Sequence, residues 1–263
     1  MCKWENALSH AKLIGKVIQV CQAHAPGVLW SVVLDGKSHQ GATLAQLTLK
    51  CPLNPNSKIF PLLSPLHHLN LLVRDNDVTC DKDFKHLFKR LRTLLLQMGS
   101  FRILNMTITP SVLEWHLREG GVSSVSLRTL LNPSDKQDVP KALELLKHVS
   151  DLSLAPDDCN PTWIAQRHAI YLMGCICYLL MRPFTDVTFC LWQQLEYLSA
   201  ASHLRLVLFQ ENPQRGEFMP TQLYTDIQLM IKNVFFCATK EKITNPNGRI
   251  YIILLGTDWL EML

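Results

Sequence analysis

The stretch FKHLFKRLRTLLLQM, residues 84–98, is the most regular pattern in the chain and does most to decide the fold. Its apolar side chains fall at offsets 0, 3, 4, 7, 11 and 14, which is the spacing of one face of an α-helix. They are Phe84, Leu87, Phe88, Leu91, Leu95 and Met98. Gly99 follows and is typical of a helix end. A helix with such a stripe buries it against a second layer, so we expect the flanking residues to supply that layer.

The flanking residues predict one further helix and four strands. Helical spacing over 8–21 ends before Pro26 and Gly27. Apolar or alternating runs typical of strands occur at 28–34, 43–49, 66–73 and 101–108. The first two of these runs flank a turn sequence, so we expect them to form a hairpin. The predicted order is α-β-β-β-α-β, a two-layer, sandwich-like subdomain over residues 1–110.

By element order alone, this arrangement resembles the two-layer units of ribosomal-protein-like domains and the transducer modules of some ATPases and topoisomerases. The resemblance lies in the β-β-β-α-β part and includes no sequence motif. It implies a DNA-associated role as one alternative.

Residues 111–263 predict a helix-rich subdomain. Helical patterns cover 111–117, 140–149, 163–181, 187–198 and 221–238, with Pro183 expected to end the third. Two late strands are expected at 203–209 and 250–255, which would form a β-α-β unit across the last helix. The fold class is therefore α+β. The longest apolar run, 169–181, is shorter than the ~20 residues of a membrane span, so we expect a core helix and no membrane span.

Composition restricts the compartment and the partners. Nine cysteines, an odd number without regular spacing, are typical of free buried thiols, and no secretory signal is evident at the start. We therefore expect an intracellular protein, cytoplasmic or nuclear. Net charge is +7 over residues 1–110 and −3 over residues 111–263. The charged fraction of 18% is below the usual ~25%, which suggests that a partner covers part of the surface.

A row of cations is the strongest candidate for a binding site. Lys82, Lys85, Lys89 and Arg92 lie at offsets 0, 3, 7 and 10, on the helix face opposite the apolar stripe. Arg74 and Arg102, on flanking strands, extend the row. Such a row can neutralise phosphates or meet an acidic partner. An ordinary solvated face is the competing interpretation, because no aromatic residues for base stacking alternate with the cations.

No catalytic or metal-binding pattern stands out. His67 and His68 are expected in a strand, where neighbouring side chains point to opposite faces and cannot share a metal. Cys159 and His168 are the candidates if the chain is an enzyme of unrecognised class, but neither has a partner at a recognisable spacing. Phosphate-binding and dinucleotide-binding glycine motifs and the nucleophile elbow are missing from the sequence. We therefore predict no catalytic residues, no metal and no cofactor.

Tryptophans near the ends of elements are candidates for a protein interface. They are Trp4, Trp115, Trp192 and Trp259, and burial in the protein's own core is the competing explanation. The chain ends at Leu263 soon after an apolar run. This leads us to expect a truncated chain, an isoform, or a chain completed by a partner.

The first functional hypothesis is a non-enzymatic intracellular subunit that binds a protein partner within a larger complex. The alternative is a nucleic-acid-associated subunit, acting in a DNA transaction, that uses the basic row. An enzyme of unrecognised class is the third.

Overall fold

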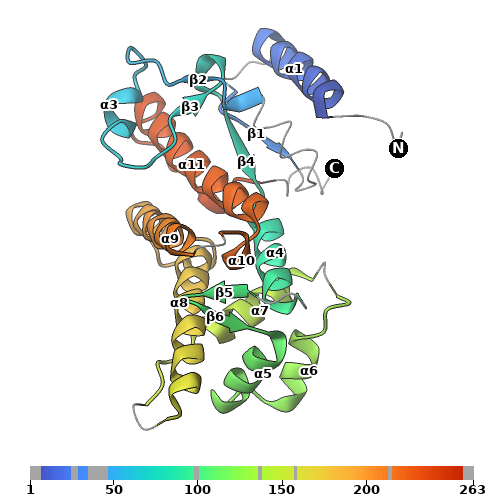
Figure 1. Cartoon of the computed structure of the whole chain (residues 1–263). Helices are drawn as coiled ribbons and strands as arrows, with labels where there is room; N and C mark the ends of the chain where they lie inside the picture. The colour runs from blue at the N-terminus through green and yellow to red at the C-terminus, as the bar shows by residue number, and fades with distance from the viewer. Residues whose placement is uncertain are drawn as a thin grey trace. The chain divides into compact units, whose positions relative to one another are not determined.

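The fold is α+β, as the sequence predicts, with many helices and a few short strands (Figure 1). The computed structural model describes residues 7–24, 29–34, 47–97, 101–135, 138–156, 159–212 and 215–256. Its contacts divide the chain into two compact units. Unit 1 comprises residues 1–84 and 225–263, and unit 2 comprises residues 85–224. The boundary expected near residue 110 falls inside unit 2, because unit 1 is built from both ends of the chain.

Unit 1 joins short strands to two long helices. Its elements are α1 (Ala7–His24), β1 (Ser31–Leu34), β2 (Cys51–Pro52), α3 (Phe60–Leu63), β3 (Leu72–Val73), the 3-10 turn η1 (Asp75–Asp77), β4 (Thr79–Lys82), most of α11 (Thr221–Thr244), and the 3-10 turn η2 (Ile252–Leu254). β1 pairs in parallel with β4, and β2 pairs antiparallel with β3. The expected hairpin between 28–34 and 43–49 is therefore wrong for its first strand, which pairs with β4 instead.

Helix α11 supplies apolar side chains to the core of unit 1. Phe236 packs with Leu53 and Val73 of the β2–β3 region, and Leu229 packs with Cys80 of β4. Since these partners are far from α11 in sequence, the end of the chain is needed to complete the core of unit 1.

Unit 2 is mainly helical. Its elements are α4 (Phe84–Leu96), β5 (Phe101–Ile103), β6 (Met106–Ile108), α5 (Pro110–Glu119), α6 (Ser124–Leu130), α7 (Val139–Ser150), α8 (Pro161–Thr185), α9 (Leu191–Glu211) and α10 (Arg215–Phe218). The stripe of α4 is buried as predicted, at Leu87, Phe88, Leu91 and Leu95. β5 and β6 form a hairpin that turns at Leu104 and Asn105, both with positive φ, where one strand was expected.

Helix α8 lies at the centre of unit 2, between α7 and α9. It begins as the sequence predicts, with Asn160 accepting a hydrogen bond from the Thr162 N–H and Pro161 in the first turn. By length and composition, α8 could cross a membrane, but half of its most apolar window is buried inside the protein. This burial agrees with the core helix expected from the sequence. Pro183 lies inside α8, which continues to Thr185 rather than ending before the proline.

The two late strands and the third early strand differ from expectation. Residues 203–209 are part of α9, and residues 250–255 contain η2 rather than a strand. Of the strand expected at 66–73, residues 72 and 73 form β3, and residues 66–68 lie in a turn. Apolar and polar residues alternate at 203–209 because α9 has apolar residues on several sides. The two-residue period typical of a strand is therefore coincidental here.

A close contact between α7 and α8 gives a stability prediction. A Cβ added at Gly174 would lie 2.5 Å from the Val149 carbonyl oxygen, which is backbone and cannot move aside easily. We expect Gly174→Ala to lower the free energy of unfolding by about 2 kcal/mol, although alanine favours a helix. Gly216→Ala, in the same unit, has open space around the added methyl group and should have little effect. Urea unfolding of both variants checks this, and equal stabilities would contradict the close contact.

Candidate functional site at the end of strand β4

Three consecutive charged residues end β4 and continue beyond it. They are Asp81, Lys82 and Asp83, and all three side chains are buried. β4 runs parallel to β1, whose last residue, Leu34, pairs with Lys82. A buried charge is costly unless it is paired or hydrogen-bonded. The groups around this triplet therefore form the candidate site of unit 1.

Lys82 forms a buried ion pair with α11. Its Nζ lies 3.3 Å from Asp226 Oδ1, and the two side chains are 2% and 1% exposed. Both charges have left water at a cost of several kcal/mol each. Their mutual attraction in a low-dielectric interior returns part of this cost, and separating them would leave a buried charge without a counterion. The pair therefore holds the end of β4 against the first part of α11.

Asp81 titrates in an unusual range. Burial, with a smaller contribution from the negative charge of Asp83, raises the pKa of Asp81 to about 7. The rise is limited by the Lys82 backbone N–H, which donates to Asp81 Oδ1 over 2.8 Å, and by the side chains of Asn233 and Lys82. Near neutral pH the carboxyl group is therefore about half protonated.

Asn233 links Asp81 to the start of β4. Thr79 Oγ1 donates to Asn233 Oδ1 over 2.6 Å, and the Cys237 thiol, one turn further along α11, lies 3.6 Å from the same oxygen. Burial raises the pKa of the Cys237 thiol to about 12, so the thiol keeps its proton. The face of α11 beneath β4 is thus polar. The Asn233 oxygen is hydrogen-bonded, whereas the buried Asn233 Nδ2 has no hydrogen-bond partner among the described residues.

Two buried lysines on α11 bind backbone carbonyl groups of the strands. Lys240 Nζ donates to the carbonyl oxygens of Trp30, over 2.9 Å, and Asp77, over 2.6 Å. Lys232 Nζ donates to the Leu72 carbonyl oxygen. Burial lowers the pKa of Lys232 to about 8 and also lowers the pKa of Lys240. These ammonium groups satisfy acceptors at the ends of β1, β3 and η1.

The chain returns to this cluster near its end. Gly256 has a φ of +146°, which residues with side chains rarely adopt, and an added Cβ would lie 3.5 Å from Asp83 Oδ2. Glycine therefore allows the segment after η2 to approach the acidic end of β4.

Asp226 and Asp81 each have a protein partner within the cluster, the Lys82 ammonium and the Lys82 backbone N–H respectively. Over the ranges that the structure describes, no group of three or more His, Cys, Asp or Glu side chains is placed to hold a metal ion. His67 and His68 lie in an exposed turn after α3 rather than in the expected strand. The cluster therefore ties β4 to α11 and holds a proton near neutral pH, and its carboxylates are turned away from solvent.

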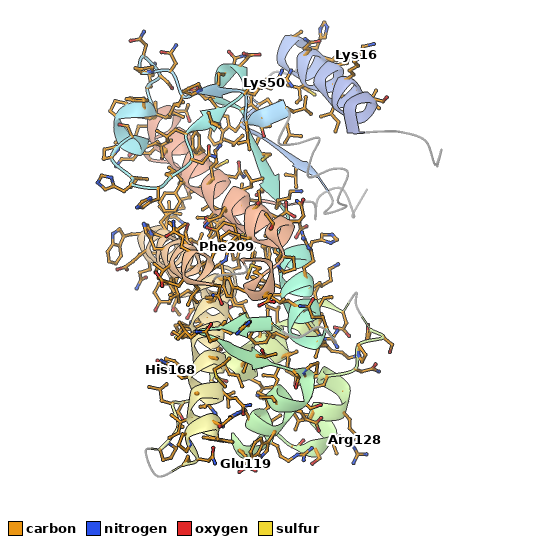
Figure 2. The ribbon with its side chains drawn as sticks, viewed as in Figure 1. Lys16, Lys50, Glu119, Arg128, His168 and Phe209 are labelled. Atoms are coloured by element: carbon orange, nitrogen blue, oxygen red, sulfur yellow. The ribbon has the colours of Figure 1, made fainter. Side chains whose placement is uncertain are left out.

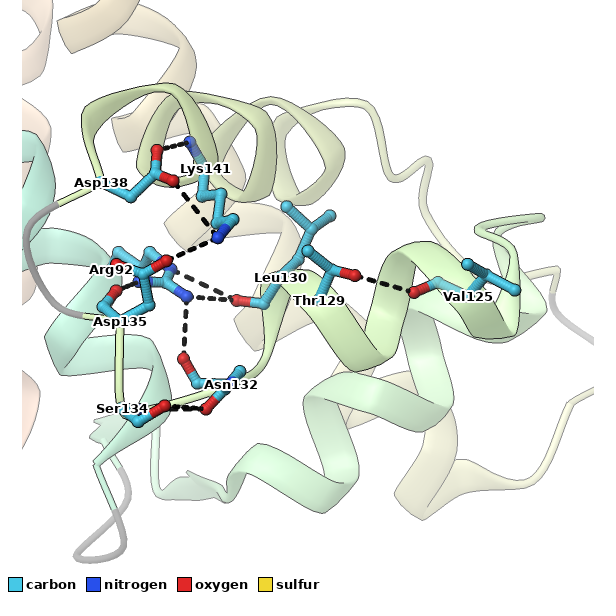
Figure 3. Close-up of polar contacts among 9 residues, drawn as sticks. All are labelled: Arg92, Val125, Thr129, Leu130, Asn132, Ser134, Asp135, Asp138 and Lys141. Atoms are coloured by element: carbon cyan, nitrogen blue, oxygen red, sulfur yellow. Dashed lines mark hydrogen bonds and ion pairs between the residues drawn. The ribbon is translucent and has the colours of Figure 1, made fainter.

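The predicted basic row does not form a single solvent-exposed face. Lys82 is bound to Asp226, as described above, and Arg92 is buried in unit 2. Figure 3 shows the Arg92 guanidinium binding the carbonyl oxygens of Leu130, over 2.9 Å, Asn132, over 2.9 Å, and Asp135. Lys82 belongs to β4 and not to the helix, so the predicted helix face holds only Lys85, Lys89 and Arg92 of the row. The segment between α6 and α7 covers the end of that face at Arg92.

The other members of the row differ in exposure. Arg74 is buried, near Gly15 of α1. Arg102 is part-exposed and its Nη1 lies 3.2 Å from Glu217 Oε2. Lys85 and Lys89 are half-buried, so they remain candidates for phosphate contact.

Two of the four tryptophans predicted at an interface can be placed. Trp192 is 68% exposed in the first turn of α9. Trp115 is about half exposed, and its ring meets that of Trp163 edge to face at a centroid distance of 6.4 Å. Trp4 and Trp259 lie outside the described residues. An interface role for these tryptophans stays a prediction.

Sequence reasoning missed the acidic cluster. Asp81, Asp226 and Asn233 belong to none of the sites predicted from the sequence. A usable pattern exists in hindsight: Asp226 and Asn233 lie seven residues apart, on one face of an otherwise apolar helix. Cys159 is half-buried before α8, and His168 is exposed on that helix, where Figure 2 labels it.

Comparison with known proteins identifies a fold relative. No family model and no curated protein matches the sequence. Among solved structures, the chain is similar to one in the Drosophila P element transposase strand transfer complex, with a TM-score of 0.60 and 13% sequence identity. The match covers 98% of this chain and 58% of that chain. This chain therefore spans less than two thirds of the length of its relative, and at this identity the likeness shows a shared fold.

The raised pKa of Asp81 predicts how stability depends on pH. The folded protein holds this proton more tightly than the unfolded chain, whose aspartates titrate near pH 4. The contribution of Asp81 is therefore fully present below about pH 4 and is lost as pH rises through about 7. We expect the free energy of unfolding to fall by about 3 kcal/mol over this range, and Asp81→Asn to flatten the decline. Urea unfolding from pH 5 to 8 measures this. Asp75→Asn, at an exposed site, is the matched control, and parallel profiles for all three proteins would refute the assignment.

The ion pair predicts a non-additive mutant cycle. Asp226→Leu alone leaves the Lys82 ammonium buried without its partner and should cost about 4 kcal/mol. Adding Lys82→Met removes the orphaned charge and should restore most of that loss. Chemical denaturation of the two single variants and the double variant gives the coupling. If the loss in free energy of unfolding of the double variant equals the sum of the losses of the two single variants, the pair is not the interaction that holds β4 to α11.

Proposed function

We propose that this chain is an intracellular, nucleic-acid-associated protein that takes part in a DNA transaction without catalysing strand transfer itself. The observation that carries the proposal is the fold shared with the transposase chain over 98% of this sequence. A transposase in a strand transfer complex acts on DNA, and a fold retained over this length can retain a DNA-facing surface. Fold alone does not fix function, so the surface itself has to be tested.

The acidic cluster supports the non-catalytic part of the proposal. Phosphoryl transfer to or from DNA commonly uses carboxylates that hold divalent metal ions next to the substrate. Here Asp226 is paired with the Lys82 ammonium, and Asp81 is buried and half protonated near neutral pH. Carboxyl groups in this state are poor ligands for Mg²⁺, because binding would require deprotonation and loss of the ion pair.

The remaining cations support phosphate contact. Residues 1–110 carry a net charge of +7, and Lys85 and Lys89 lie one turn apart on α4 with part of each side chain accessible. Contacts between lysine and phosphate need no defined geometry, and they release counterions from DNA, which makes binding dependent on salt. We therefore assign phosphate contact to this pair, because part of each side chain is accessible.

Charge reversal on α4 tests the proposal. We expect the wild-type chain to bind a mixed-sequence DNA duplex, with an affinity that falls as salt rises from about 50 to about 200 mM. Lys85→Glu with Lys89→Glu should weaken binding and reduce the slope of log K against log salt by about 1.8. Fluorescence anisotropy with a labelled duplex measures both quantities.

The control reverses two other lysines. Lys58→Glu with Lys242→Glu changes the net charge equally at exposed sites of unit 1 and should keep the wild-type slope. Failure of the wild-type chain to bind at low salt, or equal effects of the two double variants, would reject the proposed surface. Nicking of plasmid DNA in the presence of Mg²⁺, lost in Asp81→Asn, would reject the non-catalytic assignment.

A protein-binding subunit remains the second candidate function. It is favoured by large apolar side chains at the surface, including Trp192 and three residues of α1. The two functions are compatible, because DNA-associated proteins commonly work in complexes.

A further inference from the structure

Helix α1 attaches to the rest of unit 1 through one narrow face. Ile14 and Ile18 are buried and pack with Leu47, with Leu29 and Val32 at the edge of the same cluster. These two isoleucines are one turn apart, as expected for a helix that lies on a core with a single stripe.

A second apolar stripe on α1 is left uncovered. Leu13, Val17 and Val20 are 55%, 54% and 58% exposed. At about 100° per residue, these three side chains fall within about 60° of one another around the axis, next to the face that carries Ile14 and Ile18. Scattered exposed apolar residues are ordinary, but an aligned stripe over two turns is typical of an interaction site.

The charges along this stripe have one sign. Lys12 and Lys16 are exposed and lie on the side of the stripe away from the buried isoleucines, and Figure 2 labels Lys16 on α1. The sequence of α1, ALSHAKLIGKVIQVCQAH, contains no acidic residue. A partner that covers the stripe therefore lies next to the ammonium groups of Lys12 and Lys16 along one edge. Negatively charged residues on that edge of the partner would complement them.

The same charges argue against two other occupants. In a second copy of this chain, α1 against α1 would bring lysines together without any acid on either helix, which disfavours pairing of like helices. A helix that lies on lipid usually presents bulky aromatic anchors and a polar face rich in Lys and Arg. α1 has no aromatic residue and only two lysines.

We propose that the stripe formed by Leu13, Val17 and Val20 docks an amphipathic helix of a partner protein that carries acidic residues along one flank. The partner helix would place apolar residues at i, i+3 or i+4, and i+7 over two turns, and a Glu or Asp row against Lys12 and Lys16. This docking surface does not depend on nucleic-acid binding, so the two proposals stand or fall separately.

Peptide binding tests the docking surface. The probes are two 18-residue helical peptides with the same leucine stripe, one flanked by glutamates and the other by lysines. We expect the wild-type chain to bind the glutamate peptide at least about tenfold more tightly than the lysine peptide. The triple variant Leu13→Ser, Val17→Ser, Val20→Ser should lose about tenfold or more in affinity for the glutamate peptide. Isothermal titration calorimetry measures these affinities.

A matched variant controls for general loss of surface hydrophobicity. Leu154→Ser, Val125→Ser and Val187→Ser remove one leucine and two valines, all more than half exposed, from unit 2. This variant should bind the glutamate peptide as the wild-type chain does. Circular dichroism and thermal unfolding should be unchanged in both triple variants, because Ile14 and Ile18 are retained.

Charge reversal decides the chemistry of the partner. Lys12→Glu with Lys16→Glu should invert the preference, so that the lysine peptide binds more tightly. The proposal is overturned if neither peptide binds, or if the preference does not invert. It is also overturned if sedimentation shows a dimer that the α1 triple variant abolishes. Tighter binding to phosphatidylserine vesicles than to the glutamate peptide would overturn it as well.

Discussion

The architecture of unit 1 depends on the need to satisfy buried polar groups between α11 and the strands. Asp226 pairs with Lys82, Asn233 accepts from Thr79, and Lys240 caps two backbone carbonyl groups. The hydrophobic effect is non-directional, whereas hydrogen bonds and ion pairs depend on distance and angle, so each of these contacts is lost if α11 shifts by a turn. The polar contacts therefore fix the register between the last long helix and strands that come from the beginning of the chain.

Helices were largely predictable from the sequence, and strand pairing was not. The stripe of α4 and the Asn160–Pro161 start of α8 are local patterns, so periodicity and capping residues were enough. β1 and β4 pair in parallel across nearly fifty residues of chain, and no local pattern specifies such a partner. Residues 203–209 alternate between apolar and polar because α9 has apolar residues on several sides, and this alternation predicted a strand. In the structure the same residues are helical and pack as part of α9.

The candidate site shows the same division between local and long-range information. Helical spacing correctly places Lys85, Lys89 and Arg92 on one face of α4. It does not reveal that Arg92 binds carbonyl oxygens of the α6–α7 segment instead of pointing into solvent, because that depends on tertiary packing. The acidic cluster assembles from β4 and α11, and in the sequence these two elements are separated by unit 2. A fold match at 13% identity fits this picture, since an arrangement of buried stripes can persist while the residues that make it change.

The discontinuity of unit 1 has a consequence for biosynthesis. Residues 1–84 leave the ribosome well before α11 is made, because all of unit 2 is translated in between. At about 5–20 residues per second, this interval lasts on the order of ten seconds or more. Throughout it, Leu53, Val73 and Cys80 lack the part of their native packing that Phe236 and Leu229 supply. Nascent residues 1–84 thus expose apolar side chains until α11 is made, and slower translation would prolong that exposure.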